Sequence, residues 1–133
     1  MDNLDKIKVV LYCRTSTNAQ NIISQTDALF NECEENEWEI KKAFKDEGVS
    51  RYQTKRDGFC ALIKYIKKNK VDKIVVWDMT RISGDVEFCK SFICDMTELG
   101  VSIFFVERRT KAEMELLSDK MNIINIFIIF VSN

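Results

Sequence analysis

The chain of 133 residues contains no histidine. A serine–histidine catalytic triad is therefore excluded, and a reactive serine would need help from an arginine, a carboxylate, water or a metal ion. A zinc site is disfavoured as well, because the five cysteines are widely spread and lack the paired short spacing of zinc ligands. We expect no metal site, and we expect reduced, partly buried thiols in a cytoplasmic protein.

The sequence also lacks an excess of positive charge, since 20 Lys and Arg residues stand against 21 Asp and Glu residues. A domain that binds duplex DNA tightly by itself usually carries a basic excess, so tight autonomous DNA binding is not indicated.

Long hydrophobic runs are missing too. The most apolar stretch, residues 123–131, contains Asn125 and is shorter than the roughly 20 residues that span a bilayer. We expect a helix that packs on protein, and no membrane segment.

Proline, internal repeats and low-complexity linkers are absent, which favours one continuous domain. Apolar or partly alternating segments predict strands at residues 7–12, 38–44, 74–77 and 101–106. Helical periodicity predicts helices at residues 18–36, 58–68 and 85–99. Because strands and helices alternate, we expect an α/β fold with a parallel sheet. The polar stretch 46–55 has no periodicity and is expected to be a mobile loop.

The end of the first predicted strand is where the sequence most clearly indicates a functional site. Arg14 and Ser16 follow its apolar residues, at the carboxyl edge where α/β sheets bind ligands. Thr17 and Gln20 fit a capping box, which by itself indicates only the start of a helix. That cap requires neither Arg14 nor Ser16, and a serine beside a helix N-terminus lies where a phosphate is attracted.

Arginine is the expected partner of such a phosphate. A guanidinium stays charged, forms bidentate bonds to phosphate oxygens and can stabilise a pentacoordinate transition state. Three arginines fall at predicted strand ends or adjoining loops: Arg14, Arg56 and Arg81. Neither G-x-G-x-x-G after the first strand nor G-x-x-x-x-G-K-[ST] occurs, which argues against dinucleotide, kinase and NTPase sites.

The chain resembles the serine recombinases of the resolvase/invertase family. The opening YCRTST at residues 12–17, followed by Gln20 and Gln25, is similar to the family's Y-x-R-x-S-T…Q…Q pattern. Further similar segments follow in the family's order: DEGVS at 46–50, RDGF at 56–59, VVWDMTRIS at 75–83 and GVSI at 100–103. The resemblance covers nearly the whole chain.

The resemblance implies a three-layer, resolvase-like fold with a mostly parallel central sheet, followed by the start of a long C-terminal helix. Residues 1–110 would form the catalytic core, and residues 111–133 the start of a dimerisation helix. The chain stops inside that helical pattern, so we expect a truncated helix and an absent DNA-binding domain. The implied partners are DNA and further copies of the chain, as a homodimer and as a tetramer in the synaptic complex.

The resemblance also implies the roles of individual residues. Ser16 would attack the DNA backbone, form a 5′-phosphoserine link and release a 3′-hydroxyl, with no metal, ATP or other cofactor. Arg14, Arg56 and Arg81 would bind the scissile phosphate. Supporting positions would be Gln20, Ser50, Tyr12, Gln25 and Thr80, of which Tyr12 fits strand packing equally well.

The sequence departs from the family pattern at two positions. Thr80 stands where the family usually has an acidic residue, and Gly84 where it has a further arginine. Arg51 or Arg108 could restore the missing charge. The alternative from another class is a non-catalytic oligomerisation or regulatory module that keeps the recombinase fold. A receiver or flavodoxin-like module fits less well, because a receiver needs acidic residues where Arg14 stands.

Overall fold

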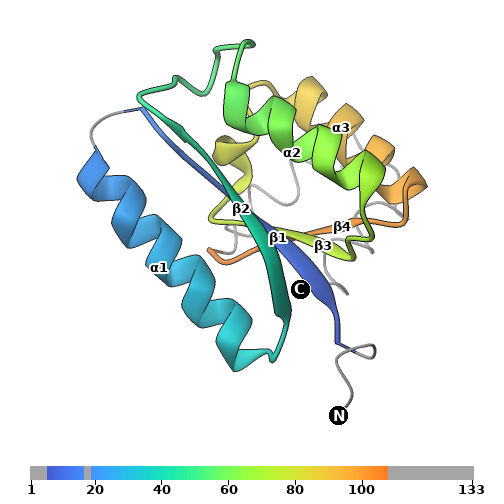
Figure 1. Ribbon diagram of the computed structural model, residues 1–133. Helices are drawn as coiled ribbons and strands as arrows, with labels where there is room; N and C mark the ends of the chain where they lie inside the picture. The colour runs from blue at the N-terminus through green and yellow to red at the C-terminus, as the bar shows by residue number, and fades with distance from the viewer. Residues whose placement is uncertain (1–5, 17–18, 108–133) are drawn as a thin grey trace.

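The computed structural model describes residues 6–16 and 19–107, and these residues form a four-stranded sheet with helices on both faces (Figure 1). The strands are β1 (Lys8–Thr15), β2 (Glu39–Glu47), β3 (Lys73–Val76) and β4 (Ser102–Phe105). They pair in the order β2-β1-β3-β4, and every pair is parallel. The predicted parallel α/β sheet is therefore confirmed.

Three α-helices and one short 3-10 helix connect the strands. Helix α1 (Ala19–Glu35) covers one face of the sheet, whereas α2 (Asp57–Lys68) and α3 (Val86–Glu98) cover the other (Figure 1). The 3-10 helix η2 (Met79–Arg81) follows β3. The three layers agree with the expected fold. The predicted helix from residue 111 onward lies outside the described residues.

Strand β1 joins the two halves of the core. Its residues alternate between the faces, so that Val9, Leu11 and Cys13 belong to the cluster under α1, and Val10 and Tyr12 to the cluster under α2 and α3. All residues from Val9 to Thr15 are buried. A strand covered on both faces reads as a continuous apolar run, which is why the sequence indicated this element.

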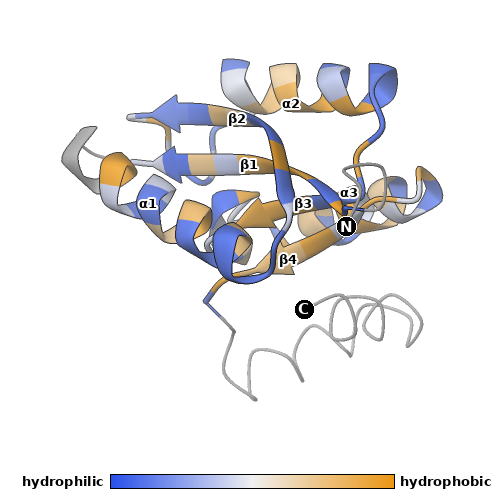
Figure 2. Cartoon of the chain, turned by 60° about the horizontal axis from the view of Figure 1, so that its bottom comes forward, coloured by the Kyte–Doolittle hydropathy of each residue, from blue (hydrophilic) through white to orange (hydrophobic). Residues whose placement is uncertain are grey.

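The hydropathy colouring agrees with this layering. In Figure 2, β3 and β4 are mostly hydrophobic, and each helix carries hydrophilic residues along part of its surface. No helix within residues 6–16 and 19–107 is both long enough and apolar enough to cross a membrane.

The prediction that a loop begins at residue 46 is wrong by two residues, because β2 continues through Asp46 and Glu47. The Asp46 carboxylate is buried and accepts hydrogen bonds from the backbone N–H groups of Gly58 and Phe59, at 2.8 and 2.9 Å. These bonds fasten the end of β2 to the first turn of α2. Gly48 follows the last residue of β2, and its φ of 67° lies in the left-handed region that glycine adopts readily.

The sheet order creates a switch point beside β1. The connection through α1 leads from β1 to β2, while the connection through α2 returns past β1 to β3 on its other side. Ligands of open α/β sheets bind where neighbouring connections diverge in this way, beyond the carboxyl ends of the strands. Ser16 follows β1 at this point, and Arg81 ends the 3-10 helix that follows β3.

Candidate active site

Ser16 is exposed and lines a cavity of about 480 Å³ at the carboxyl edge of the sheet. Arg81, Trp77 and residues of α1 also line it. Among the described residues, the lining consists of Thr15, Ser16, Ser24, Gln25, Ala28, Trp77 and Arg81. The expected nucleophile is thus solvent-accessible, lies in a concave site and shares that site with one of the three expected arginines.

Gln25 fixes the end of β1 against α1. Its side-chain oxygen accepts from the backbone N–H of Arg14 at 3.1 Å, and its side-chain nitrogen donates to the Arg14 carbonyl at 3.3 Å. A single buried amide therefore satisfies both backbone groups of one residue, as a neighbouring strand would. Gln25 positions the chain two residues before Ser16.

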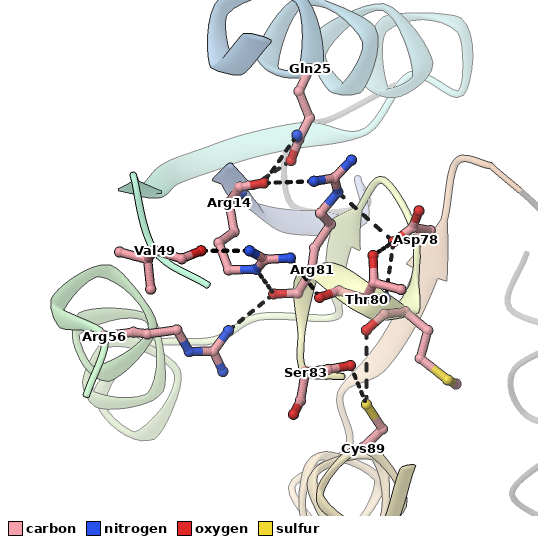
Figure 3. A network of polar contacts seen from close by, with 10 residues as sticks. Arg14, Gln25, Val49, Arg56, Asp78, Thr80, Arg81, Ser83 and Cys89 are labelled. Carbon is pink, nitrogen blue, oxygen red and sulfur yellow. Dashed lines mark hydrogen bonds and ion pairs between the residues drawn. The ribbon is translucent and has the colours of Figure 1, made fainter. Parts of the chain in front are cut away.

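Arg14 is only 2% exposed, and its guanidinium group donates to three backbone carbonyl groups. The acceptors are the oxygens of Val49 at 2.6 Å, Thr80 at 2.9 Å and Arg81 at 3.3 Å (Figure 3). One cation thereby ties the loop after β2 and the helix after β3 to β1. Arg14 is not among the described residues that line the cavity, and its expected contact with phosphate stays a prediction.

Arg56 has a similar environment. It is 3% exposed, donates to the Arg81 carbonyl at 3.1 Å, and holds its guanidinium 4.3 Å from the centre of the Phe59 ring. Its Nε atom is buried and has no hydrogen-bond partner among the described residues. The carbonyl of Arg81 thus accepts from both Arg14 and Arg56, which brings all three expected arginines together (Figure 3).

Arg81 is the member of this group whose side chain lines the cavity with Ser16. One Nη donates to the Arg14 carbonyl at 3.0 Å, and Nε lies 3.8 Å from an oxygen of Asp78. That separation allows an ion pair but is too long for a hydrogen bond. Within the described chain, Nε of Arg81 and the buried hydroxyl of Thr15 both lack a hydrogen-bond partner.

The three arginines give the site a concentrated positive charge. Burial lowers the pKa of the Arg14 guanidinium, and the neighbouring charges of Arg81, Arg56 and Arg51 lower it further. Among the described residues, Asp78 alone forms a salt bridge with any of these arginines. The site therefore favours an anion, which would relieve repulsion between the guanidinium groups.

Tyr12 lies in the core and not in the cavity lining. Its hydroxyl donates to Asp46 at 2.6 Å, and its ring packs edge-on against Phe59 with centroids 5.3 Å apart. Burial raises the pKa of Tyr12 well above its usual value, and the hydrogen bond to Asp46 adds to the effect. This geometry favours strand packing over chemistry.

The remaining supporting residues lie around the same edge. Ser50 is exposed in the loop after β2, where its hydroxyl accepts from the backbone N–H of Tyr52 at 3.2 Å. The Thr80 hydroxyl donates to Asp78 at 2.5 Å, and its carbonyl accepts from Arg14. Gln20 belongs to the first turn of α1, and its side chain lies outside the described residues. The same holds for the predicted cap at Thr17.

Asp78 is a site residue that the sequence did not single out. It accepts from the backbone N–H of Thr80 at 2.9 Å, caps η2 and pairs with Arg81. The available signal was an Asp placed just before a short helical turn, which is a typical capping position. Trp77 and Ser24 carried no such signal, because only the fold brings them to the cavity wall.

The described residues contain no group of three or more His, Cys, Asp or Glu side chains that could hold a metal ion. The polar donors of the site are instead guanidinium, hydroxyl and amide groups. These groups bind oxyanions and lack the oxygen ligand set that Mg²⁺ prefers.

Comparison with known proteins confirms the resemblance to the resolvase family that the sequence motifs indicated. The family model described as "Resolvase, N terminal domain" matches residues 9–128. The transposon Tn552 resolvase of Staphylococcus aureus is 31% identical over 96 residues, which make up 72% of this chain and 44% of that protein. The chain therefore spans less than half the length of this curated relative.

Solved structures show the same fold. The N-terminal catalytic domain of TP901-1 integrase has a TM-score of 0.73 at 23% identity, over 84% of this chain and 90% of that one. A resolvase family site-specific recombinase from Streptococcus pneumoniae has a TM-score of 0.68 at 25% identity, over 86% and 85%. The chain belongs to the resolvase family and contains its N-terminal domain.

Proposed function

We propose that this chain is the catalytic domain of a site-specific DNA recombinase that cleaves and rejoins DNA through a 5′-phosphoserine intermediate on Ser16. The observation that supports this proposal most directly is that the exposed Ser16 and Arg81 line the same cavity. Two further, buried arginines, Arg14 and Arg56, donate to the Arg81 carbonyl. A hydroxyl nucleophile and a concentrated positive charge are the two requirements of attack on a phosphodiester.

In the proposed step, the Ser16 oxygen attacks phosphorus as its hydroxyl proton leaves. The bond from phosphorus to the 3′-oxygen breaks, and that oxygen takes up a proton and departs as a 3′-hydroxyl. One phosphodiester replaces another, so the bond energy is retained in the Ser16 ester. Rejoining is the reverse attack by a 3′-hydroxyl, and neither ATP nor a metal ion takes part.

The arginines would divide the work between contact and support. Arg81 lines the cavity and is placed to donate to a phosphate oxygen there. Arg14 and Arg56 hold the carbonyls of Thr80 and Arg81, and so position the segment that carries Arg81. Their charges also stabilise the extra negative charge of the transition state, where a preorganised cation has its largest effect.

The proposed chemistry sets the number of chains needed. One Ser16 cleaves one strand, so a double-strand break needs two copies of the chain, and an exchange between two duplexes needs four. We accordingly propose a homodimer that pairs into a tetramer during synapsis. We also propose that the chain acts in the cytoplasm.

The test fuses the full chain to a sequence-specific DNA-binding domain and incubates the fusion with DNA that carries the matching sites. A covalent protein–DNA adduct, resistant to denaturant and absent in Ser16→Ala, is expected. Ser24→Ala is the matched control, since it removes an exposed hydroxyl from the same cavity. An adduct that persists in Ser16→Ala would contradict the assignment of the nucleophile.

The alternative of a non-catalytic recombinase-fold module has one observation in its favour. All three nitrogens of the Arg14 guanidinium already donate to backbone carbonyls, as expected of a purely structural arginine. Under this alternative the fusion would bind its DNA and assemble into oligomers, yet form no adduct in any variant.

A further inference from the structure

Gly84 and the loop after β2 pack together unusually closely. The Gly84 backbone N–H donates to the Arg51 carbonyl at 3.0 Å. A Cβ atom on Gly84 would lie 2.6 Å from a ring carbon of Tyr52, and 2.7 and 2.8 Å from Cδ and Cγ of Arg51. The φ angle of Gly84 is not positive, so this position needs glycine for space and not for backbone conformation.

This packing fixes where the Arg51 side chain starts. Two residues earlier, the Val49 N–H donates to the Thr15 carbonyl at 2.9 Å, and the Val49 carbonyl accepts from Arg14 at 2.6 Å. The loop is therefore bonded to the residue that precedes Ser16. With its stem lying against Gly84, Arg51 extends from a segment that is bonded to the end of β1 through Thr15 and Arg14 and to Gly84 on the other side of η2.

The guanidinium of Arg51 is available for a ligand. Arg51 is exposed, and its side chain forms no hydrogen bond or ion pair with the part of the chain that the structure describes. Its charge nevertheless acts on the site, because Arg51 contributes to lowering the pKa of Arg14. Arg14, Arg56 and Arg81 each use guanidinium donors on backbone carbonyls, whereas Arg51 uses none.

We propose that Arg51 is a phosphodiester-binding residue of the candidate active site, and that Gly84 provides the space in which its side chain lies. Arginine suits this task because its planar group keeps its charge and binds two phosphate oxygens at once. The inference rests on the proposed function for the identity of the anion. It goes beyond that function by assigning a fourth arginine and a partner glycine.

The first measurement is the salt dependence of DNA binding by the fusion protein, which requires no cleavage. Loss of one phosphate contact reduces the slope of log K against log salt by about 1. We expect that reduction in Arg51→Ala, and no change in Lys55→Ala, which removes the same charge from the same exposed loop. Equal slopes for Arg51→Ala and the unmodified protein would overturn the proposal, as would equal reductions in both variants.

The second measurement is the rate of adduct formation. We expect Arg51→Ala to slow it by about 100-fold, Arg51→Lys to recover part of the loss, and Lys55→Ala to leave it unchanged. No adduct in any protein would contradict the phosphoserine chemistry, and the salt slopes would then decide the role of Arg51 by themselves. An adduct formed equally fast by Arg51→Ala would remove Arg51 from the site and leave the proposed function intact.

The third measurement tests the coupling to Gly84. Gly84→Ala puts a methyl group against Cγ and Cδ of Arg51, and we expect it to slow adduct formation by about 10-fold. In Arg51→Ala these two atoms are gone and only the exposed Tyr52 ring has to move, so the same substitution should cost little more. Independent, multiplicative losses in the double variant would contradict the coupling. Thermal unfolding of each variant separates a folding defect from this effect.

Discussion

The middle of β1 and its carboxyl end are buried to a similar extent but are held in place by different forces. Val9, Leu11 and Cys13 pack among apolar side chains from α1 and the neighbouring strands. Arg14, only 2% exposed, is instead held by hydrogen bonds that link it to Gln25, Val49, Thr80 and Arg81. Apolar packing tolerates small adjustments, whereas a network of directed bonds fixes the geometry of the residues beside it.

This difference shows how the fold separates stability from chemistry. The polar end lies at the edge where Ser16 emerges, so its bonds set the position of the nucleophile relative to Arg81. A substitution in the middle of the strand should lower stability while leaving the site intact. A substitution at the end should lower both stability and activity.

The largest effect is expected for Arg14→Ala. Removing the guanidinium takes a donor from three backbone carbonyls, of which, among the described residues, only that of Arg81 keeps another donor, Arg56, and we expect the free energy of unfolding to fall by about 3 to 5 kcal/mol. Adduct formation at a temperature where the variant is folded should fall by at least about 100-fold. Urea unfolding and an adduct assay check the two parts. Lys45→Ala, an exposed cation on β2, is the control and should change neither.

Leu11→Ala should have a comparable or smaller effect on stability and almost none on chemistry. Leu11 is fully buried, so its truncation leaves a cavity that costs about 2 to 5 kcal/mol. Below its unfolding temperature, the variant should form adduct within a few-fold of the unmodified rate. A loss of activity as large as that of Arg14→Ala would remove the distinction between the two parts of β1.

Gln25→Ala tests the amide that clamps Arg14. The Arg14 N–H loses its side-chain acceptor, while the Arg14 carbonyl loses one donor and keeps Arg81, and we expect the free energy of unfolding to fall by about 1 to 3 kcal/mol. Because the position of Ser16 depends on this clamp, adduct formation should slow by about 10-fold as well. Asn31→Ala, on an exposed position of the same helix, is the comparison. If both variants behaved alike, Gln25 would have no positioning role.

The smallest expected effect is a pH dependence of stability that arises from Cys33, which packs with the apolar residues of β1. Burial raises the pKa of the Cys33 thiol to about 11, so the folded state holds this proton more tightly than the unfolded chain does. Stability from Cys33 is complete below the unfolded pKa and is lost as pH rises from about 9 to 11, by about 1 to 3 kcal/mol. Urea unfolding at pH 8 and pH 10.5 should show a smaller decrease in Cys33→Ala. An equal decrease in both proteins would contradict the shift.

The buried apolar strands could be predicted from the sequence, whereas the hydrogen-bonded site at their carboxyl edge could be predicted only in outline. Residues 7–12 and 74–77 read as buried strands because strands covered on both faces are continuously apolar. The sequence also located Ser16 and Arg14 at a sheet edge. It did not indicate that Arg14 would bind the carbonyls of Val49, Thr80 and Arg81, because these acceptors carry no side-chain signature and meet only in the folded chain.

Asp46 and Gly84 are two further residues whose environment could not be predicted from the sequence. Asp46 was assigned to a loop because it opens a polar stretch without periodicity, yet it is buried and accepts hydrogen bonds from Tyr12 and from two N–H groups of α2. Gly84 was seen only as a missing arginine. The structure shows that it is the surface on which Arg51 and Tyr52 pack, a relation between residues more than 30 positions apart.

The central claim is that Ser16 carries the DNA during strand exchange. The most direct measurement traps the cleaved complex, digests the protein and the DNA, and locates the attached nucleotide by mass spectrometry. We expect a 5′-phosphonucleotide ester on Ser16, with a free 3′-hydroxyl on the other DNA end. A nucleotide attached to another residue, or linked through its 3′-phosphate, would contradict it.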